Sequence, residues 1–176
     1  PAAPDPAGLV EQAGYETEGG VVVKKLDDFL AKLEENQMWG FRITVNPTYR
    51  RTEDGGRKRL LGHITVAQQT QWLLDRAEAN GFQIPMSVEV GGDLPVLENE
   101  AGERVDGRNL LVSLVDRRVE NFVRVKGEDK RPVTLKLATF QGTLKVTDPR
   151  ALRSALANGI GRAKGYGAGL LTLARP

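Results

Sequence analysis

The sequence of 176 residues contains no cysteine and a single histidine, His63. The absence of cysteine excludes disulfides and thiolate-ligated metal sites, and it fits a reducing compartment. A single imidazole excludes a histidine-rich metal centre and removes most of the usual acid–base catalysts. No apolar run approaches the roughly 20 residues that a transmembrane helix needs. The sequence therefore indicates no metal ion and no cofactor, and we expect a cytoplasmic protein without a membrane partner.

The formal net charge of +2 is distributed unevenly along the chain. Residues 41–76 carry 7 basic and 3 acidic side chains, and residues 117–176 carry 13 and 4, whereas residues 1–40 and 77–116 are acidic. Two basic blocks separated by acidic ones favour a polyanionic partner that contacts part of the surface. A charged, solvated face without a partner is the alternative that the charge pattern leaves open.

The first half of the chain alternates between extended and helical patterns. Apolar and polar residues alternate over residues 39–45, which predicts a strand with one buried face. Thr65 followed by Gln68 is a capping-box pattern, and it predicts a helix that ends at residues 80–81, an Asn-Gly pair. Five cations around an Asp-Gly-Gly turn predict a basic hairpin: Arg50, Arg51, Arg57, Lys58 and Arg59.

The second half reads as an α+β unit of ferredoxin-like type. Residues 91–109 are rich in Gly, Asp, Glu and Asn, and we interpret them as a linker. Asp148 and Pro149 predict the start of a helix that an Asn-Gly pair ends at Gly159. Four strands are predicted, over residues 110–115, 119–125 (irregular at Asn121), 133–139 (followed by a bulge at Gly142) and 170–173.

Residues 159–169 form a glycine-rich loop with five glycines in eleven residues. Glycine permits positive φ and close backbone approach to a ligand, and the cations and the aromatic ring of this loop suit phosphate contact and stacking. The loop leads into a strand, which excludes a Walker loop and a dinucleotide fingerprint. A tight crossover that needs glycine only for packing is the alternative. The candidate ligand contacts are Gly159, Gly161, Arg162, Lys164, Gly165 and Tyr166.

A second basic stretch straddles the predicted hairpin between residues 117 and 136. A two-stranded ribbon that carries cations can follow a phosphate backbone or enter a groove. The alternative is an edge hairpin that charge protects from aggregation. The cations are Arg117, Arg118, Arg124, Lys126, Lys130, Arg131 and Lys136, and only Glu120, Glu128 and Asp129 oppose them.

His63 and the two tryptophans have simpler interpretations. His63 precedes a helix, and no carboxylate or nucleophile is placed beside it by spacing, so a packed position is favoured over a catalytic one. Trp39 and Trp72 fall on apolar faces, where we expect core positions.

Three segments, residues 39–47, 62–74 and 146–171, resemble the CasE family of CRISPR RNA-processing subunits of type I-E Cascade complexes. The Gln-Gln-Thr-Gln-Trp run of residues 68–72 and the glycine-rich tail carry most of the resemblance. It implies two tandem ferredoxin-like domains: residues 1–90 as the remainder of the first, 91–109 as the linker and 110–176 as the second. The first would lack its opening strand and helix in this chain.

The resemblance also implies a function. Family members bind the repeat stem-loop of precursor CRISPR RNA and cleave it without a metal ion, by attack of a ribose 2′-OH on the adjacent phosphate. They then stay on the RNA and join the other Cascade subunits. The implied RNA contacts are the cations from Arg117 to Arg131 and the glycine-rich loop.

One departure affects catalysis. The family carries its catalytic histidine or tyrosine on an opening helix, and we do not find that pattern here. His63 falls at another point, so we assign no catalytic residue. Two alternatives stay open: a non-catalytic scaffold subunit that binds an RNA hairpin, and a ferredoxin-like domain that binds a small anion at its glycine-rich loop.

Overall fold

The computed structural model describes residues 25–53, 55–86, 97–98, 104–105 and 110–175. The chain divides into two compact units, residues 1–33 and residues 34–176, and we describe each by itself. The described part of the first unit contains a short helix, α2 (Asp27–Leu30). No helix in the described part of the chain is long and apolar enough to cross a membrane.

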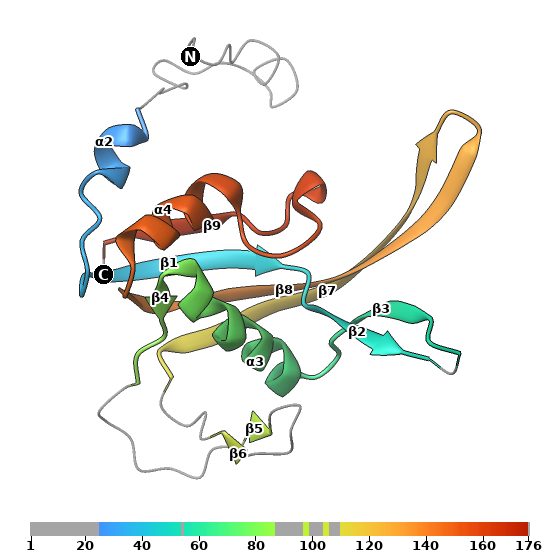
Figure 1. Ribbon diagram of the computed structural model, residues 1–176, viewed down its shortest axis with the longest axis horizontal. Coiled ribbons are helices and arrows are strands. Elements are labelled where there is room, and N and C mark those ends of the chain that lie inside the picture. Colours follow the sequence, from blue (N-terminus) through green and yellow to red (C-terminus); the bar gives the residue numbers. More distant parts are fainter. Residues whose placement is uncertain (1–24, 54, 87–96, 99–103, 106–109, 176) are drawn as a thin grey trace. The chain divides into compact units, whose positions relative to one another are not determined.

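An antiparallel sheet forms the centre of the second unit (Figure 1). It consists of β1 (Met38–Val45), β4 (Phe82–Gln83), β7 (Val112–Lys126), β8 (Asp129–Val146) and β9 (Leu171–Ala174). The strand order is β4-β8-β1-β9, and β7 pairs with β8 beside this path. Together with its helices, the sheet makes the unit an α+β fold, as predicted.

Strands from both sides of residues 91–109 belong to this one sheet, because β1 pairs with β8 and with β9. The division of the chain into residues 1–90, 91–109 and 110–176 stays an expectation. The tandem arrangement of two domains stays an expectation from the resemblance. Within residues 91–109 the structure describes a short pair of strands, β5 (Leu97–Glu98) and β6 (Arg104–Val105).

The two principal helices begin and end where the sequence predicts. α3 (Val66–Ala77) has the capping box, in which Thr65 Oγ1 accepts a hydrogen bond from Gln68 N at 3.2 Å. It continues into the 3₁₀ helix η1 (Glu78–Asn80), which ends at Gly81 with a φ of 78°. Asp148 caps α4 (Pro149–Asn158) by accepting hydrogen bonds from two backbone N–H groups.

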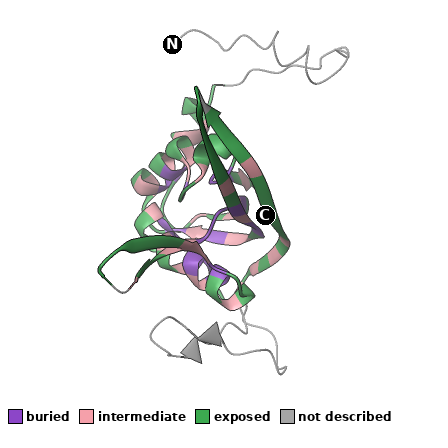
Figure 2. Ribbon diagram, turned by 90° about the vertical axis from the view of Figure 1, so that its right-hand side faces the viewer, coloured by how far each residue is buried: buried purple, intermediate pink, exposed green. Residues whose placement is uncertain are grey.

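Most of the core lies on one face of the sheet, and Figure 2 shows buried segments on both the strands and the helices. Phe41, Ile43 and Val45 on β1 are at most 3% exposed, and Phe140 and Leu144 on β8 are fully buried. Buried residues of the helices complete this core: Trp72, Leu73 and Ala77 of α3, and Leu152 and Ala155 of α4. Both helices therefore cover the same apolar face, as side-chain alternation along the strands requires.

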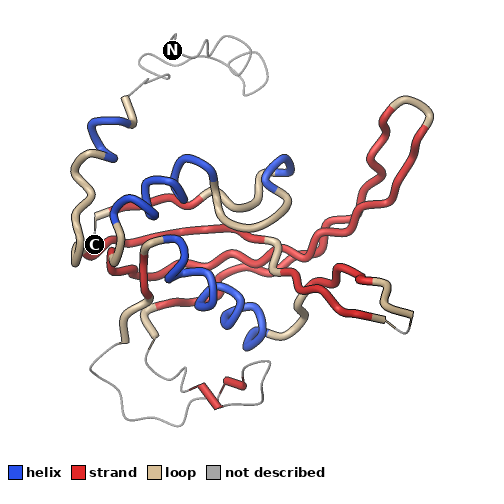
Figure 3. The backbone as a smooth tube through the Cα atoms, in the orientation of Figure 1, coloured by secondary structure: helices blue, strands red, loops and turns tan. Residues whose placement is uncertain are grey.

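β7 and β8 extend together beyond the rest of the sheet as a long two-stranded arm (Figures 1 and 3). We call residues 117–136 the basic arm. The predicted irregularity at Asn121 is wrong, because Asn121 pairs in register with Thr134 and the register shifts between Leu114 and Asp116 instead. The hydrogen bond that Thr134 Oγ1 donates to Asn121 Oδ1 at 2.8 Å supports the regular pairing.

The predicted bulge at Gly142 is also wrong. Gly142 pairs in register with Phe41 on one side and with Val112 on the other. A Cβ at this position would lie 2.1 Å from the carbonyl oxygen of Leu111. Glycine is needed there because the chain entering β7 crosses close to β8.

The predicted basic hairpin is confirmed as β2 (Thr48–Thr52) and β3 (Lys58–Gly62), which pair with each other as a separate two-stranded sheet. Period-two alternation along β2 places Arg50 and Arg51 on opposite faces of this hairpin.

Candidate nucleic-acid interface

The cations of the basic arm are divided between its two faces. Residues directly opposite each other on antiparallel strands share a face, so the register assigns each side chain. Arg124 pairs with Arg131, and both lie on the face that carries Phe122 and Val133. Lys130 pairs with Val125 and Lys136 with Val119, so these two lysines lie on the other face together with Arg117.

The face with Phe122 packs against the glycine-rich loop. Leu135 and Leu137 of β8 are each 6% exposed and form a cluster with Ala168 of the loop. The rings of Phe122 and Tyr166 lie 5.0 Å apart, centroid to centroid. This packing brings the second basic stretch and the glycine-rich loop, two features separated in the sequence, onto one side of the molecule.

Two arginines on this face hold carboxylate partners. Arg118 lies between Asp116 and Glu120, with N–O distances of 2.7 and 3.1 Å. The hydrogen bond to Asp116 raises the pKa of Arg118 above its usual value. Arg131 contacts Asp129 at 2.8 Å. Arg124 forms no ion pair among the described residues, so the charges of Arg118 and Arg131 are offset and that of Arg124 is not.

The opposite face of the arm combines cations with exposed valines. Val119 and Val123 are each 57% exposed. Arg117 donates a hydrogen bond to the carbonyl oxygen of Ile64, which holds the base of this face against the start of α3. The Lys136 stem packs over Gly62, where a Cβ would lie 2.9 Å from Lys136 Cδ. The side chain of Lys126 lies outside the described residues.

Much of the glycine-rich loop is shaped by packing. A Cβ on Gly161, at a φ of +84°, would lie 2.8 Å from Cη2 of Trp72. A Cβ on Gly169, at a φ of +90°, would lie 2.5 Å from the carbonyl oxygen of Ile160. A Cβ on Gly159 would lie 2.9 Å from the carbonyl oxygen of Gly169. The packing interpretation therefore accounts for these three glycines.

Gly165 is different, because its φ is not positive and a Cβ there would meet no atom within 4 Å. It lies in η3 (Lys164–Tyr166), the exposed turn of the loop. Arg162, Lys164 and Tyr166 around it are exposed, Tyr166 by 44%. This part of the loop is open to a ligand, and nothing near Gly165 requires a glycine for packing.

The backbone of the loop further limits where an anion can bind. The N–H of Ile160 donates to Gly169 O, that of Gly169 donates to Thr44 O, and that of Tyr166 donates to Ala163 O. The N–H groups of Ile160, Tyr166 and Gly169 are therefore not available to an anion that binds the backbone of this loop.

His63 is packed, in agreement with the favoured interpretation. It is 5% exposed, and its ring lies 4.7 Å from that of Tyr49. Its backbone N–H donates to the carbonyl oxygen of Pro47. Trp72 is buried as expected, whereas Trp39 is half-buried and donates from Nε1 to Gln37 Oε1 at 3.1 Å.

Arg76 is not among the site residues predicted from the sequence. Its guanidinium carbon lies 4.0 Å from the centre of the Trp72 ring, and its Nη1 donates to the carbonyl oxygen of Trp72. The signal was available, because residues four positions apart on a helix are neighbours. Arg76 joins the hairpin residue Arg50 and the loop residue Arg162 in the lining of one pocket.

The chain is similar to known proteins. A family model described as CRISPR associated protein matches residues 1–175. The chain is 30% identical over 147 residues to the CRISPR-associated endoribonuclease Cse3 of Thermus thermophilus, covering 83% of this chain and 60% of that protein. The chain thus spans about three fifths of the length of this curated relative.

The chain is also similar to solved structures of CRISPR-associated proteins. The chain is similar to CRISPR endoribonuclease Cse3 bound to a 19-nucleotide RNA, with a TM-score of 0.59 and 27% identity over 82% of this chain and 58% of that one. It is also similar to a chain of a CRISPR RNA-guided surveillance complex, with a TM-score of 0.59 and 28% identity over 87% of this chain and 60% of that one.

Proposed function

The chain belongs to the CRISPR-associated protein family, and from this membership we propose that it binds the stem-loop of a CRISPR repeat RNA and takes part in its cleavage. The observation that carries the proposal is the packing of the basic arm against the glycine-rich loop through Phe122 and Tyr166. This packing brings the arm that carries Arg124 next to the loop that carries Lys164. The similar Cse3 structure bound to RNA supports an RNA ligand.

The arm suits a stem better than a single base. This face of the arm carries Arg118, Arg124 and Arg131, with carboxylates beside the first and the last. Cations recognise phosphates without regard to sequence. An RNA stem presents two phosphate backbones and 2′-hydroxyls, and proteins read it mainly by shape. Arg124 and Arg131 lie directly opposite each other, so a phosphate between them would relieve a like-charge contact.

The proposed cleavage is attack of a ribose 2′-oxygen on the adjacent phosphorus as the bond to the 5′-oxygen breaks. The products are a cyclic phosphate and a free 5′-hydroxyl, and no metal ion takes part. Lys164 is the exposed cation of the open turn, and there it would stabilise the negative charge that develops on the phosphate. We assign no general base among the described residues.

We further propose that the protein stays with the cleaved RNA as a subunit of a Cascade complex in the cytoplasm. The similarity to a chain of a CRISPR RNA-guided surveillance complex supports this role. The absence of cysteine is compatible with a reducing compartment. A second candidate is a scaffold subunit that binds the hairpin without cleaving it, because the described residues include no placed catalytic base.

The test is incubation with a labelled CRISPR-repeat hairpin in EDTA, resolved on native and denaturing gels. A shifted band and a single cut support binding and metal-independent cleavage. A shift without a cut supports the scaffold function, and no shift at low salt overturns the proposal. The matched control is the same hairpin with a 2′-deoxyribose at the cut position, which should bind equally well and resist cleavage.

A further inference from the structure

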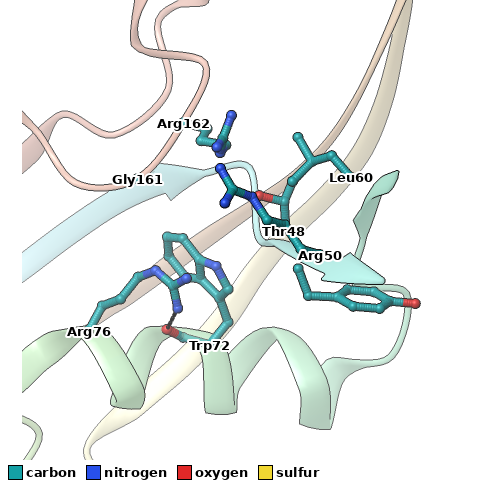
Figure 4. Close-up of a pocket in the computed structure, with 8 residues that line it drawn as sticks. Thr48, Arg50, Leu60, Trp72, Arg76, Gly161 and Arg162 are labelled. Carbon is teal, nitrogen blue, oxygen red and sulfur yellow. Dashed lines mark hydrogen bonds between the residues drawn. The ribbon is translucent and has the colours of Figure 1, made fainter. Parts of the chain in front are cut away.

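A pocket of about 260 Å³ lies between the β2–β3 hairpin, helix α3 and the glycine-rich loop (Figure 4). It is separate from the basic arm, because neither β7 nor β8 contributes to its lining. The lining residues are Thr48, Tyr49, Arg50, Leu60, Trp72, Arg76, Gly161 and Arg162.

Three arginines reach this pocket from three different elements. Arg50 comes from β2, Arg76 from α3 and Arg162 from the loop, and Figure 4 shows their side chains around the same space. None of the described lining residues is acidic. The like charges of Arg50 and Arg162 repel each other in this pocket, and a bound anion would offset that repulsion.

The pocket is held in shape by contacts to Trp72. The Arg76 guanidinium lies over one face of the indole and is fixed by its hydrogen bond to the Trp72 carbonyl. On the loop side, Gly161 approaches the indole so closely that a Cβ would meet Cη2 at 2.8 Å. Asn46 and Arg162 form an isolated β-bridge, which anchors the loop to the end of β1. The backbone that carries Arg162 is therefore positioned before any ligand arrives.

The contacts and burial of the aromatic rings in the pocket favour a phosphate over a base as the ligand. Arg76 covers the Trp72 ring, and the ring of Tyr49 lies 4.7 Å from that of His63. Because Trp72 is only 3% exposed, its indole offers little surface on which a base could stack. Arg50 and Arg162 are exposed, and arginine matches the oxygens of a phosphate with two parallel hydrogen bonds.

We propose that this pocket binds one phosphodiester group of an RNA strand, with Arg50 and Arg162 as its direct ligands and Arg76 as a supporting charge. The inference rests on the proposed function, because it takes the ligand to be part of the RNA that the basic arm holds. It adds a contact on the β2–β3 hairpin, outside the arm. Such a contact recognises the backbone without reading the base.

The first test uses Trp72 as a reporter. The indole N–H resonance of Trp72 should shift in an NMR titration with octauridylate, and that of Trp39, which does not line the pocket, should stay in place. Uridine, which has no phosphate, should shift neither. No shift of Trp72 with octauridylate overturns the inference. Inorganic phosphate binding as tightly as octauridylate also overturns it, in favour of a site for the free anion.

The second test measures repeat-hairpin affinity in variants. Arg50→Gln should weaken binding about tenfold at 0.1 M salt, because a hydrogen bond to a charged group is lost. Arg51→Gln is the matched control, since Arg51 has the same charge, lies on the opposite face of β2 and does not line the pocket. Equal losses of RNA affinity in the two variants would mean that the β2–β3 hairpin contributes only through its overall charge. That result would overturn the proposed phosphodiester site.

The two proposals fail in different ways. In one outcome, Arg124→Gln weakens binding of the RNA hairpin, Arg50→Gln leaves that affinity unchanged, and octauridylate does not shift the Trp72 resonance. The pocket inference is then wrong and the proposed function stands. If the chain does not bind the hairpin at all but Trp72 responds to octauridylate, the phosphodiester site stands and the proposed function fails.

Discussion

The ring of Phe122 on the basic arm lies 5.0 Å from the ring of Tyr166 in the glycine-rich loop, with 59° between the ring planes. Tilted aromatic pairs at this distance are favourable beyond the area they bury. Phe122 also packs on the cluster formed by Leu135, Leu137 and Ala168. The position of the arm relative to the loop therefore depends on this small apolar contact.

Removing either ring should loosen the arm. We expect Phe122→Ala and Tyr166→Ala each to lower the free energy of unfolding, with a coupling energy of about 1 kcal/mol between them. A double-mutant cycle by urea unfolding measures this coupling. Both single variants should also weaken binding of the repeat hairpin, because the cations of the arm and loop would no longer be held on one side.

Tyr166→Phe is the control for this pair. It keeps the ring contact and should leave the free energy of unfolding unchanged. A coupling energy near zero would show that the two rings contribute independently, and that Phe122 does not fix the arm against the loop.

The cations of the arm should contribute unequally to RNA binding. Neutralising a phosphate contact on a duplex lowers the slope of log K against log salt by about 0.9. We expect this loss for Arg124→Gln, and a smaller one for Arg118→Gln, because Asp116 and Glu120 already offset that charge. Fluorescence anisotropy with the labelled hairpin at several KCl concentrations gives the slopes.

Two further variants test the explanation. Asp116→Asn should increase affinity at low salt, because it leaves more of the Arg118 charge available to the RNA. Arg150→Gln removes an exposed charge from α4, outside the arm, and should leave the slope unchanged. Equal slopes for Arg124→Gln and Arg118→Gln would contradict the ion-pair argument.

The sequence predicted the elements whose signals are local. The capping box at Thr65, the Asp148 cap and the glycine after η1 each involve residues a few positions apart, and all three are present. The errors at Asn121 and Gly142 have another origin. The pairing of Asn121 depends on the register between β7 and β8, and the need for glycine at position 142 depends on where Leu111 crosses β8. Both are long-range relationships, which the alternation of residues within one strand does not reveal.

The site could be predicted in parts but not as a whole. Composition identified the cations of the arm and loop, yet it could not show which of them have carboxylate partners or which face each occupies. The Arg118 pairs involve residues two positions away, a spacing that brings side chains together only if the segment is a strand. The pocket of Arg50, Arg76 and Arg162 joins three elements distant in sequence, so only the tertiary structure brings it together.

The glycines of the loop should separate into packing and ligand positions. Gly165→Ala meets no atom within 4 Å and requires no positive φ, so the free energy of unfolding should change by less than about 0.5 kcal/mol. If an RNA backbone approaches this turn closely, the same variant should weaken hairpin binding severalfold. Gly161→Ala, by contrast, places a methyl against Trp72 at a φ of +84° and should destabilise the fold by about 1–3 kcal/mol.

Thermal unfolding and anisotropy on the same two samples check this separation. A Gly165→Ala variant that is stable and binds RNA as tightly as the parent would remove the turn from the interface. The glycine at this position would then have no explanation in packing or in binding.

Gly142 should be among the least replaceable residues of the sheet. Its Cβ would lie 2.1 Å from Leu111 O and 2.8 Å from Val112 Cα, and both are backbone atoms that cannot rotate away. We therefore expect Gly142→Ala to lower the free energy of unfolding by at least ~2 kcal/mol, because β7 must shift off β8 to admit the methyl group. Gly40→Ala on β1 is the matched control, since its nearest atom, Ala174 O, lies at an ordinary 3.5 Å. If urea unfolding gives the two variants equal stability, the close crossing of Leu111 over β8 is not a feature of the protein in solution, and the base of the arm is packed differently.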